Sequence, residues 1–143
     1  MQGFFQRYLL LYRPLTSKLN ELLGEYELSY SLWQIIFHVK NNGPSTLAAI
    51  SDYFNIERPS VTRAVQRLEE KQIIEQIPGR NKREKMIQLT ELGEDVYLSC
   101  REQITTLENS VMKDIPKEEL NAAYEVLPKI RENMILRAGE QNE

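Results

Sequence analysis

The chain has 143 residues, of which 41% are hydrophobic and 27% charged, and a formal net charge of −3 at pH 7. This length suits one globular domain, and the single cysteine and single histidine exclude an internal disulfide and argue against a zinc site. We therefore expect no metal and no cofactor. No apolar run reaches the length of a membrane span, and no secretion-signal pattern follows Met1, so we expect a cytoplasmic protein without a membrane partner.

The first predicted helix runs from about Phe4 to Leu23. Its apolar residues recur at steps of three and four, which places them on one face: Phe4, Tyr8, Leu11, Leu15, Leu19 and Leu22. Pro14 lies inside this helix and lacks the amide N–H of a regular turn, so we expect a bend near Arg13.

Two shorter helices are predicted next. The first covers about Ser31 to Asn41, with Ser29 as its cap and a glycine and a proline just after its end. For the second, the hydroxyl of Ser45 or Thr46 can accept a hydrogen bond from the first free amides. Asn55 stands where a left-handed residue is needed to end it.

A fourth helix, from about Arg58 to Lys71, has an apolar and a polar face. Val61, Ala64, Val65 and Leu68 form the apolar face, and the polar face carries Ser60, Thr62, Arg63, Gln66 and Arg67. Pro59 is compatible with the first turn. Two short helices joined by a tight turn, the second with hydroxyl and arginine residues near its start, are typical of a helix-turn-helix, whose second helix enters the major groove of DNA.

The remaining elements are a hairpin and two long helices. Strands at Ile73–Ile77 and Met86–Leu89 flank a polar stretch, which predicts a hairpin with a basic tip. Thr90 can cap a helix whose apolar stripe extends to Val111, and a last helix runs from about Lys117 to Arg137. One small domain cannot cover these stripes alone, so we expect pairing with a second copy.

Basic residues are concentrated in one part of the chain. Between Arg58 and Lys85 there are eight basic and four acidic residues, which leaves a net charge of −7 for the rest. A basic patch on an acidic body can face phosphates while the other surfaces are repelled. The alternative is an ordinary solvated surface.

This order of elements resembles the multiple antibiotic resistance regulator (MarR) family. The segment from Arg58 to Glu69 is similar to the family's recognition helix, and Asn81-Lys82-Arg83 followed by Ile87 to Gly93 is similar to its wing and Leu-Thr-x-x-Gly exit. The resemblance implies a mostly α fold with a small β-hairpin wing. Residues 31–92 would form a winged helix-turn-helix, flanked by N-terminal (1–30) and C-terminal (93–143) dimerisation helices.

The resemblance also implies a function. The protein would be a sequence-specific transcription regulator, most often a repressor in this family, that binds double-stranded DNA as a homodimer. Its target would be a pseudo-palindromic operator whose half-sites lie about 10 base pairs apart. A winged-helix module that binds an acidic protein partner is the alternative. An enzyme is not expected, because the sequence has no glycine-rich phosphate loop and no nucleophile beside a base.

Three residues depart from the family pattern. Gln72 replaces a helix-ending glycine, and a left-handed residue with a side chain would cost roughly 1 kcal/mol there. Gln76 replaces a common arginine at the base of the wing. Asn81 replaces the aspartate that braces the wing arginine, which leaves a neutral acceptor and predicts a more mobile wing.

Helix position, charge and the resemblance assign two groups of residues to DNA. The helix-turn-helix group is Ser45, Thr46, Arg58, Pro59, Ser60, Thr62, Arg63, Gln66 and Arg67, and the wing group is Arg80, Asn81, Lys82, Arg83 and Lys85. Arg83 is the best candidate for a narrow minor groove. For Ser45 and Thr46 the alternative is that they only cap a helix. For the polar helix face the alternative is that its arginines form ion pairs with glutamates.

A third group could line a pocket. In the family, small aromatic effectors often bind between the dimer helices and the DNA-binding lobe, and the residues at that place here are Tyr8, Tyr12, Arg13, Trp33, Phe37 and His38. Ordinary core packing is the alternative. Cys100 falls on the inward stripe of its helix and is expected to be a small buried hydrophobe rather than an oxidant sensor.

Overall fold

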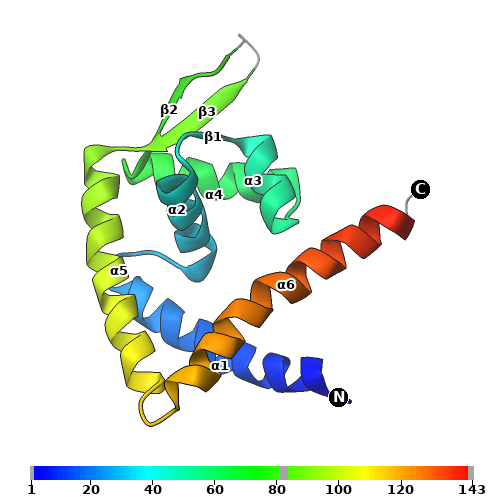
Figure 1. Cartoon of the computed structure of the whole chain (residues 1–143). Coiled ribbons are helices and arrows are strands. Elements are labelled where there is room, and N and C mark those ends of the chain that lie inside the picture. The colour runs from blue at the N-terminus through cyan, green and yellow to red at the C-terminus, as the bar shows by residue number, and fades with distance from the viewer. Residues whose placement is uncertain (1, 81–83, 142–143) are drawn as a thin grey trace. The chain divides into compact units, whose positions relative to one another are not determined.

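The computed structural model describes residues 2–80 and 84–141, with side chains up to residue 136. The described residues form long helices and a small antiparallel sheet (Figure 1). The helices are α1 (Phe4–Gly24), α2 (Tyr30–Asn42), α3 (Leu47–Phe54), α4 (Arg58–Glu70), α5 (Glu91–Val111) and α6 (Lys117–Gln141), and the strands are β1 (Ser45–Thr46), β2 (Ile74–Pro78) and β3 (Lys85–Leu89). The predicted fold class, mostly helical with a hairpin wing, is confirmed.

The chain forms two compact units, Met1–Thr105 and Thr106–Glu143. The first contains α1 to α4, the sheet and the larger part of α5, so it holds the whole winged helix-turn-helix. The second contains the end of α5 and α6. This is a division by packing, and the predicted functional regions 1–30, 31–92 and 93–143 stay a prediction. None of the described helices combines the length and apolar character needed to cross a membrane.

The sheet has three strands, and β3 lies between the other two. β2 and β3 form the predicted hairpin, with Ile74 opposite Leu89 and Pro78 opposite Lys85. β1 pairs with the other edge of β3, where Ser45 faces Ile87. This two-residue strand was not predicted, since it is too short to show the alternation by which strands are found. It ties the start of α3 to the wing.

Side-chain caps place the helix starts where the sequence predicts them. The Ser29 hydroxyl accepts from the Leu32 amide, Thr46 accepts from Ala49, and Thr90 accepts from Gly93. Each bond satisfies an amide that has no partner within its helix. Asn55 ends α3 in the left-handed region, with φ of 54°.

Both long helices that contain a proline continue through it. α1 is helical on both sides of Pro14, and α6 on both sides of Pro128. α6 extends to Gln141, past Arg137, where the sequence predicts its end. Each proline lies near the middle of its helix, where it removes one backbone hydrogen bond, but the helix resumes after it.

The core of the first unit lies between the helices and the sheet. Ile36 of α2, Ile50 of α3, Leu68 of α4, Ile74 of β2 and Ile87 of β3 are almost completely buried. Each comes from a different element, so this cluster fixes the helix-turn-helix against the wing.

Gly93 provides a second constraint at the exit of the wing. A Cβ atom at this position would collide with the carbonyl oxygen of Ile73. The same carbonyl accepts the Thr90 amide at 3.0 Å. The glycine of the Leu-Thr-x-x-Gly segment is thus needed for the close approach of α5 to the strand that begins the wing.

Candidate DNA-binding surface

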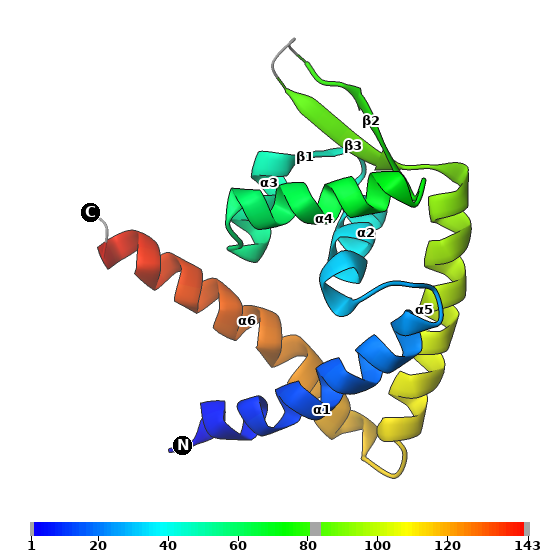
Figure 2. The ribbon, with the colours of Figure 1, turned by 180° about the vertical axis from the view of Figure 1, so that it is seen from behind.

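α4 presents a charged face to solvent and an apolar face to the core. Val61, Val65 and Leu68 are 2%, 2% and 0% exposed. Arg58 and Arg63 lie on the opposite side and are exposed, as the helical period requires. Figure 2 shows α4 lying along the surface of the lobe, with the β2–β3 hairpin projecting beside it. A recognition helix needs this arrangement, with its apolar face on the core and its charged face in solvent.

The other predicted residues of this helix differ in exposure. Pro59, Gln66 and Arg67 are exposed, while Ser60 and Thr62 are half-buried. The Thr62 hydroxyl donates to the Arg58 carbonyl at 3.0 Å.

The arginines of α4 have no ion-pair partner among the described residues. Arg63 donates from Nη2 to the Ser60 hydroxyl at 3.3 Å, which is a contact with a neutral group. Among the described residues no carboxylate forms an ion pair with Arg58, Arg63 or Arg67. The alternative, a helix face whose arginines only neutralise glutamates, is therefore not the arrangement found. Unpaired guanidinium groups on one exposed face suit phosphate and guanine, both of which accept hydrogen bonds from the arginine fork.

The end of α4 contains the strained residue that the sequence indicates. Gln72 adopts φ of 62°, in the left-handed region that favours glycine. Its conformation allows the Ile73 amide to donate to the Leu68 carbonyl at 3.0 Å. Lys71 forms a long ion pair with Glu27, 3.5 Å between Nζ and Oε2. The turn that leads from α4 into β2 thus uses a residue whose backbone conformation is unfavourable for a side chain.

The wing carries its exposed charges beside α4. Arg80 and Lys85 are exposed at the two ends of the hairpin tip. Asn81, Lys82 and Arg83, which were also assigned to DNA, lie outside the described residues.

Sequence reasoning missed a link between the wing and the recognition helix. The Gln76 side-chain amide donates to Glu69 Oε1 at 2.8 Å, and Gln88 donates to Glu75 Oε1 at 2.7 Å. The first bond joins β2 to the last turn of α4. The sequence shows Gln76 as a departure from the family's arginine, but nothing in the local pattern indicates its partner.

Ser45 and Thr46 are already engaged within the lobe. Ser45 is 7% exposed, and its hydroxyl donates to the Gly43 carbonyl at 2.9 Å. Thr46 accepts from the Ala49 amide as the cap of α3. The capping role that was weighed against DNA contact is thus present for Thr46, and Ser45 holds the preceding turn.

The six residues predicted to line an effector pocket lie in three places. Tyr8 and Tyr12 pack together on α1, with ring centroids 6.5 Å apart, and the adjacent Arg13 is exposed. Trp33 and Phe37 lie on the face of α2 turned to α5.

His38 is on a different side of α2. Its ring packs against Tyr53 and Phe54 of α3, at 4.7 and 5.6 Å between centroids. Tyr97 of α5 completes the cluster around Trp33, and sequence reasoning missed it because it lies outside the predicted stripe of its helix.

Burial changes the titration of three side chains. It raises the pKa of the Cys100 thiol to about 11, so this group is protonated at neutral pH and poorly nucleophilic. It lowers the pKa of His38, which favours the neutral imidazole. It raises the pKa of Tyr30, with smaller contributions from Tyr12 and Tyr8.

The described part of the chain contains no cluster of histidine, cysteine and carboxylate side chains that could hold a metal.

Comparison with known proteins identifies the family of the chain. Residues 26–84 match the model of the MarR family. The uncharacterized HTH-type transcriptional regulator YwoH of Bacillus subtilis (strain 168) is 33% identical over 110 residues, covering 77% of this chain and 80% of that protein.

Solved structures of other proteins share this fold over almost the whole length of the chain. Staphylococcus aureus MarR, in complex with salicylate and kanamycin, is 25% identical with a TM-score of 0.84, covering 94% of this chain and 91% of that chain. A mutant MarR from E. coli complexed with operator DNA has the same fold, with 18% identity, a TM-score of 0.79 and 90% and 94% coverage. The chain belongs to the MarR family, and it is a winged-helix, DNA-binding transcription regulator rather than an enzyme.

Proposed function

We propose that this protein is a repressor that binds a pseudo-palindromic operator as a homodimer and is released by a small aromatic effector. The observation that carries the DNA-binding part is the exposed face of α4, where Arg58, Arg63 and Arg67 have no described carboxylate partner. An arginine there can pair with guanine in the major groove or with a phosphate.

The residues proposed to contact DNA fall into two groups. Side chains of α4 would enter the major groove: Arg58, Pro59, Ser60, Thr62, Arg63, Gln66 and Arg67. Wing residues would follow the backbone or the minor groove: Arg80, Asn81, Lys82, Arg83 and Lys85. For Ser45 and Thr46, at the start of α3, we propose contact with a phosphate rather than with a base, beside the local hydrogen bonds that they make. The E. coli MarR complex with operator DNA supports this assignment by its shared fold.

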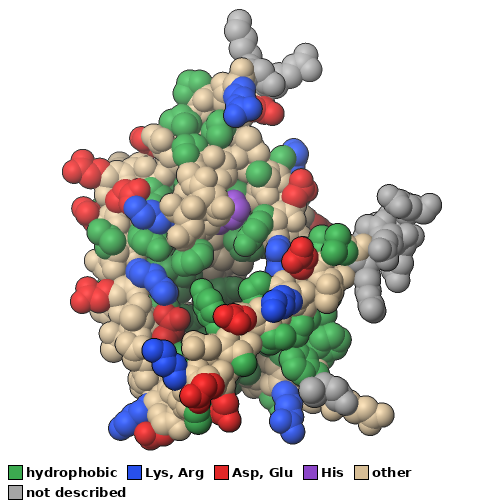
Figure 3. All heavy atoms as spheres, viewed as in Figure 1, with side chains coloured by type: hydrophobic (Ala, Val, Ile, Leu, Met, Phe, Trp, Pro, Cys, Tyr) green, Lys and Arg blue, Asp and Glu red, His purple; other side chains and the backbone are tan. Residues whose placement is uncertain are grey.

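The apolar surface of the outer helices supports the homodimer. On one face of α1, Tyr8, Leu11 and Leu15 are 46%, 57% and 42% exposed. On one face of α6, Tyr124 and Leu127 are 81% and 49% exposed, and Figure 3 shows hydrophobic side chains gathered at the surface of these helices. Soluble proteins rarely leave such continuous apolar faces in water, and a second copy in twofold symmetry covers the same face on both chains.

An aromatic effector would suit the exposed edge of the cluster on α2. Phe37 is 41% exposed beside the buried Trp33, so a flat apolar ligand could extend the cluster. The S. aureus relative was solved with salicylate. Titration of salicylate into the protein–DNA complex should release DNA in proportion to binding of the ligand, and release without a change in Trp33 emission would place the effector elsewhere.

Selection of bound fragments from random duplex DNA tests the proposed function directly. We expect an enriched sequence with twofold symmetry and half-sites about 10 base pairs apart. The log of the affinity should fall linearly with the log of the salt concentration, since the arginines displace ions from the phosphates. No enriched sequence, together with an affinity that is insensitive to salt, would instead favour a module that binds an acidic protein. Sedimentation equilibrium at the same concentrations should give twice the mass of one chain.

A further inference from the structure

α2 and α5 meet in the first unit at a joint that begins with stacked aromatic rings. Trp33 and Tyr97 are nearly parallel, with ring centroids 5.4 Å apart and an interplanar angle of 9°. Both are buried, at 6% and 8% exposed, and Phe37 packs on Tyr97 at 6.4 Å. These rings hold the middle of α2 against α5.

An ion pair continues this joint toward the end of α2. Lys40 Nζ lies 2.6 Å from Glu94 Oε2 and 5.7 Å from the centroid of the Tyr97 ring. Glu94 and Tyr97 are three residues apart and share one face of α5, so one ammonium group contacts both. The pair joins residues 54 positions apart in the sequence.

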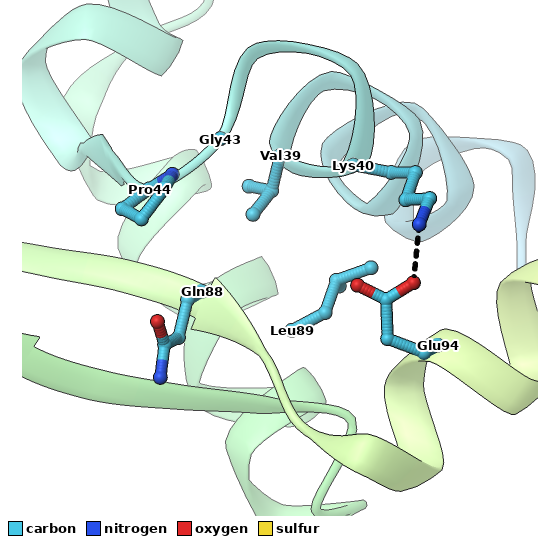
Figure 4. A pocket seen from close by; sticks show the side chains of 7 residues that line it. All are labelled: Val39, Lys40, Gly43, Pro44, Gln88, Leu89 and Glu94. Atoms are coloured by element: carbon cyan, nitrogen blue, oxygen red, sulfur yellow. Dashed lines mark hydrogen bonds and ion pairs between the residues drawn. The ribbon is translucent and has the colours of Figure 1, made fainter.

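The ion pair lies at the edge of a hollow in the surface. Figure 4 shows Lys40 and Glu94 joined to each other at one side of this hollow, which has a volume of about 160 Å³ and lies between the end of α2, β3 and the start of α5. Its other walls are Val39, Gly43, Pro44, Gln88 and Leu89. Val39, which is 3% exposed, packs beside this hollow, and the ion pair adds a direct link between α2 and α5 there.

α5 belongs to the first unit at this joint and also extends beyond that unit. α5 continues without a break to Val111, past Thr105, where the first unit ends. The recognition helix α4 is fixed to α2 through the shared core around Ile36 and Leu68. A change in the angle between α2 and α5 would thus turn the recognition helix relative to the helix that leaves the lobe.

We propose that Lys40, Glu94 and Tyr97 are positioning residues for operator binding. They hold α5 at a fixed angle to α2 and thereby set the separation of the two recognition helices in the dimer. The proposal rests on the proposed function, since it requires two recognition helices on one operator. It assigns no contact with DNA to any of the three residues.

Charge reversal with rescue tests the ion pair. Glu94→Lys and Lys40→Glu are compared with the double variant Lys40→Glu/Glu94→Lys, and with Asp95→Lys, which changes the charge of an exposed neighbour on the same helix by the same amount. Anisotropy titrations at one salt concentration use three duplexes: the selected operator, operators with one base pair added or removed between the half-sites, and a single half-site.

The positioning role predicts different results for these duplexes. Loss of a partly exposed pair and the new repulsion should weaken binding to the full operator about five- to tenfold. For Glu94→Lys this loss is measured against Asp95→Lys, so that the added positive charge cancels. The half-site affinity should change by less than about twofold, and the double variant should return to within about twofold of the wild type. The single variants should also discriminate less between spacings.

A readout without DNA accompanies these titrations. Trp33 is the only tryptophan of the chain, and its ring stacks on Tyr97. Its emission should shift in both single variants and return in the double variant, while far-UV circular dichroism stays unchanged. Glu94→Gln, which removes the charge without reversing it, should give a smaller shift in the same direction.

Two results would overturn the positioning role. One is Glu94→Lys behaving as Asp95→Lys does on every duplex, and the other is an equal loss on the half-site and on the full operator. A wild-type chain that prefers no sequence over random duplex is a different failure. It contradicts the proposed function itself, and the positioning role with it.

Discussion

α4 and α1 are both amphipathic helices of the first unit, but only α4 has its apolar face covered. Val61, Val65 and Leu68 of α4 are at most 2% exposed, whereas Leu11 on the apolar face of α1 is 57% exposed and α1 buries only Leu23. None of the α6 side chains that the structure describes is buried. The difference teaches that one chain covers the apolar face of α4 but not that of its outer helices, which the proposed homodimer would cover.

Removing a core side chain from α4 should have the largest effect. Leu68→Ala deletes a fully buried side chain and leaves a cavity, and it should lower the free energy of unfolding by about 2–5 kcal/mol in urea titrations. The matched change Leu11→Ala removes the same atoms from an exposed position on the apolar face of α1. It should instead lower stability only at protein concentrations where the dimer forms.

The concentration dependence is what separates the two leucines. Leu68→Ala should shift the urea midpoint equally at low and high protein concentration, while the effect of Leu11→Ala should disappear on dilution. An equal, concentration-independent loss for both would mean that α1 is covered within one chain.

A smaller effect is expected from the charged face of α4. Arg63→Ala should weaken binding to the selected operator by about 1–3 kcal/mol and relax the preference at one base position, because a bidentate contact with a base edge is lost. The control Lys129→Ala removes a positive charge from exposed α6 and should leave the affinity nearly unchanged. Anisotropy titrations against operators with single base changes measure both. If the two variants weaken all sequences alike, α4 does not read bases.

The residue that links α4 to the wing should give a gain in stability. Gln72 holds a left-handed φ of 62°, so Gln72→Gly should raise the free energy of unfolding by about 0.5–1 kcal/mol, the strain relieved less the entropy lost by glycine. Asn55→Gly is the matched control, since asparagine tolerates its φ of 54° well. Thermal melts of both variants are compared with the wild type, and destabilisation by Gln72→Gly would show that its side chain contributes more than its backbone costs.

The sequence pattern predicted those features of the fold that depend on residues close together in the chain. The buried and exposed faces of α4, the caps Ser29 and Thr90, and the left-handed Asn55 all follow from short-range patterns, and the structure has them. The arginines of the candidate site were found in the same way, because a helix with one apolar face must turn the other outward.

Contacts between distant segments could not be predicted. The strand β1 exists only because Ser45 meets Ile87, and the joint of α2 with α5 joins Lys40 to Glu94. Such pairs depend on tertiary packing, to which no local period corresponds. The predicted pocket residues show the same limit, since Trp33 and His38 lie on one helix but face different partners.

The smallest expected effect concerns the one histidine, which lies inside the completed lobe. His38 is 8% exposed and packs on Tyr53 and Phe54, and Asn42 Nδ2 lies 3.2 Å from its Nδ1. A neutral ring with its proton on Nε2 accepts this hydrogen bond, and the protonated ring cannot.

Burial lowers the pKa of His38 in the folded chain below its value in the unfolded chain. The unfolded state therefore binds the proton more readily, so the contribution of His38 to stability is present above the unfolded pKa of about 6.5 and is lost as the pH falls through the folded pKa. Urea titrations between about pH 7.5 and about pH 5.5 should show the wild type losing more stability than His38→Phe, which keeps a ring at this position but cannot titrate. Carboxylates titrate in both proteins and cancel in the difference. Parallel pH profiles would mean that His38 binds protons equally in both states, and that the contact between α2 and α3 leaves its ring open to water.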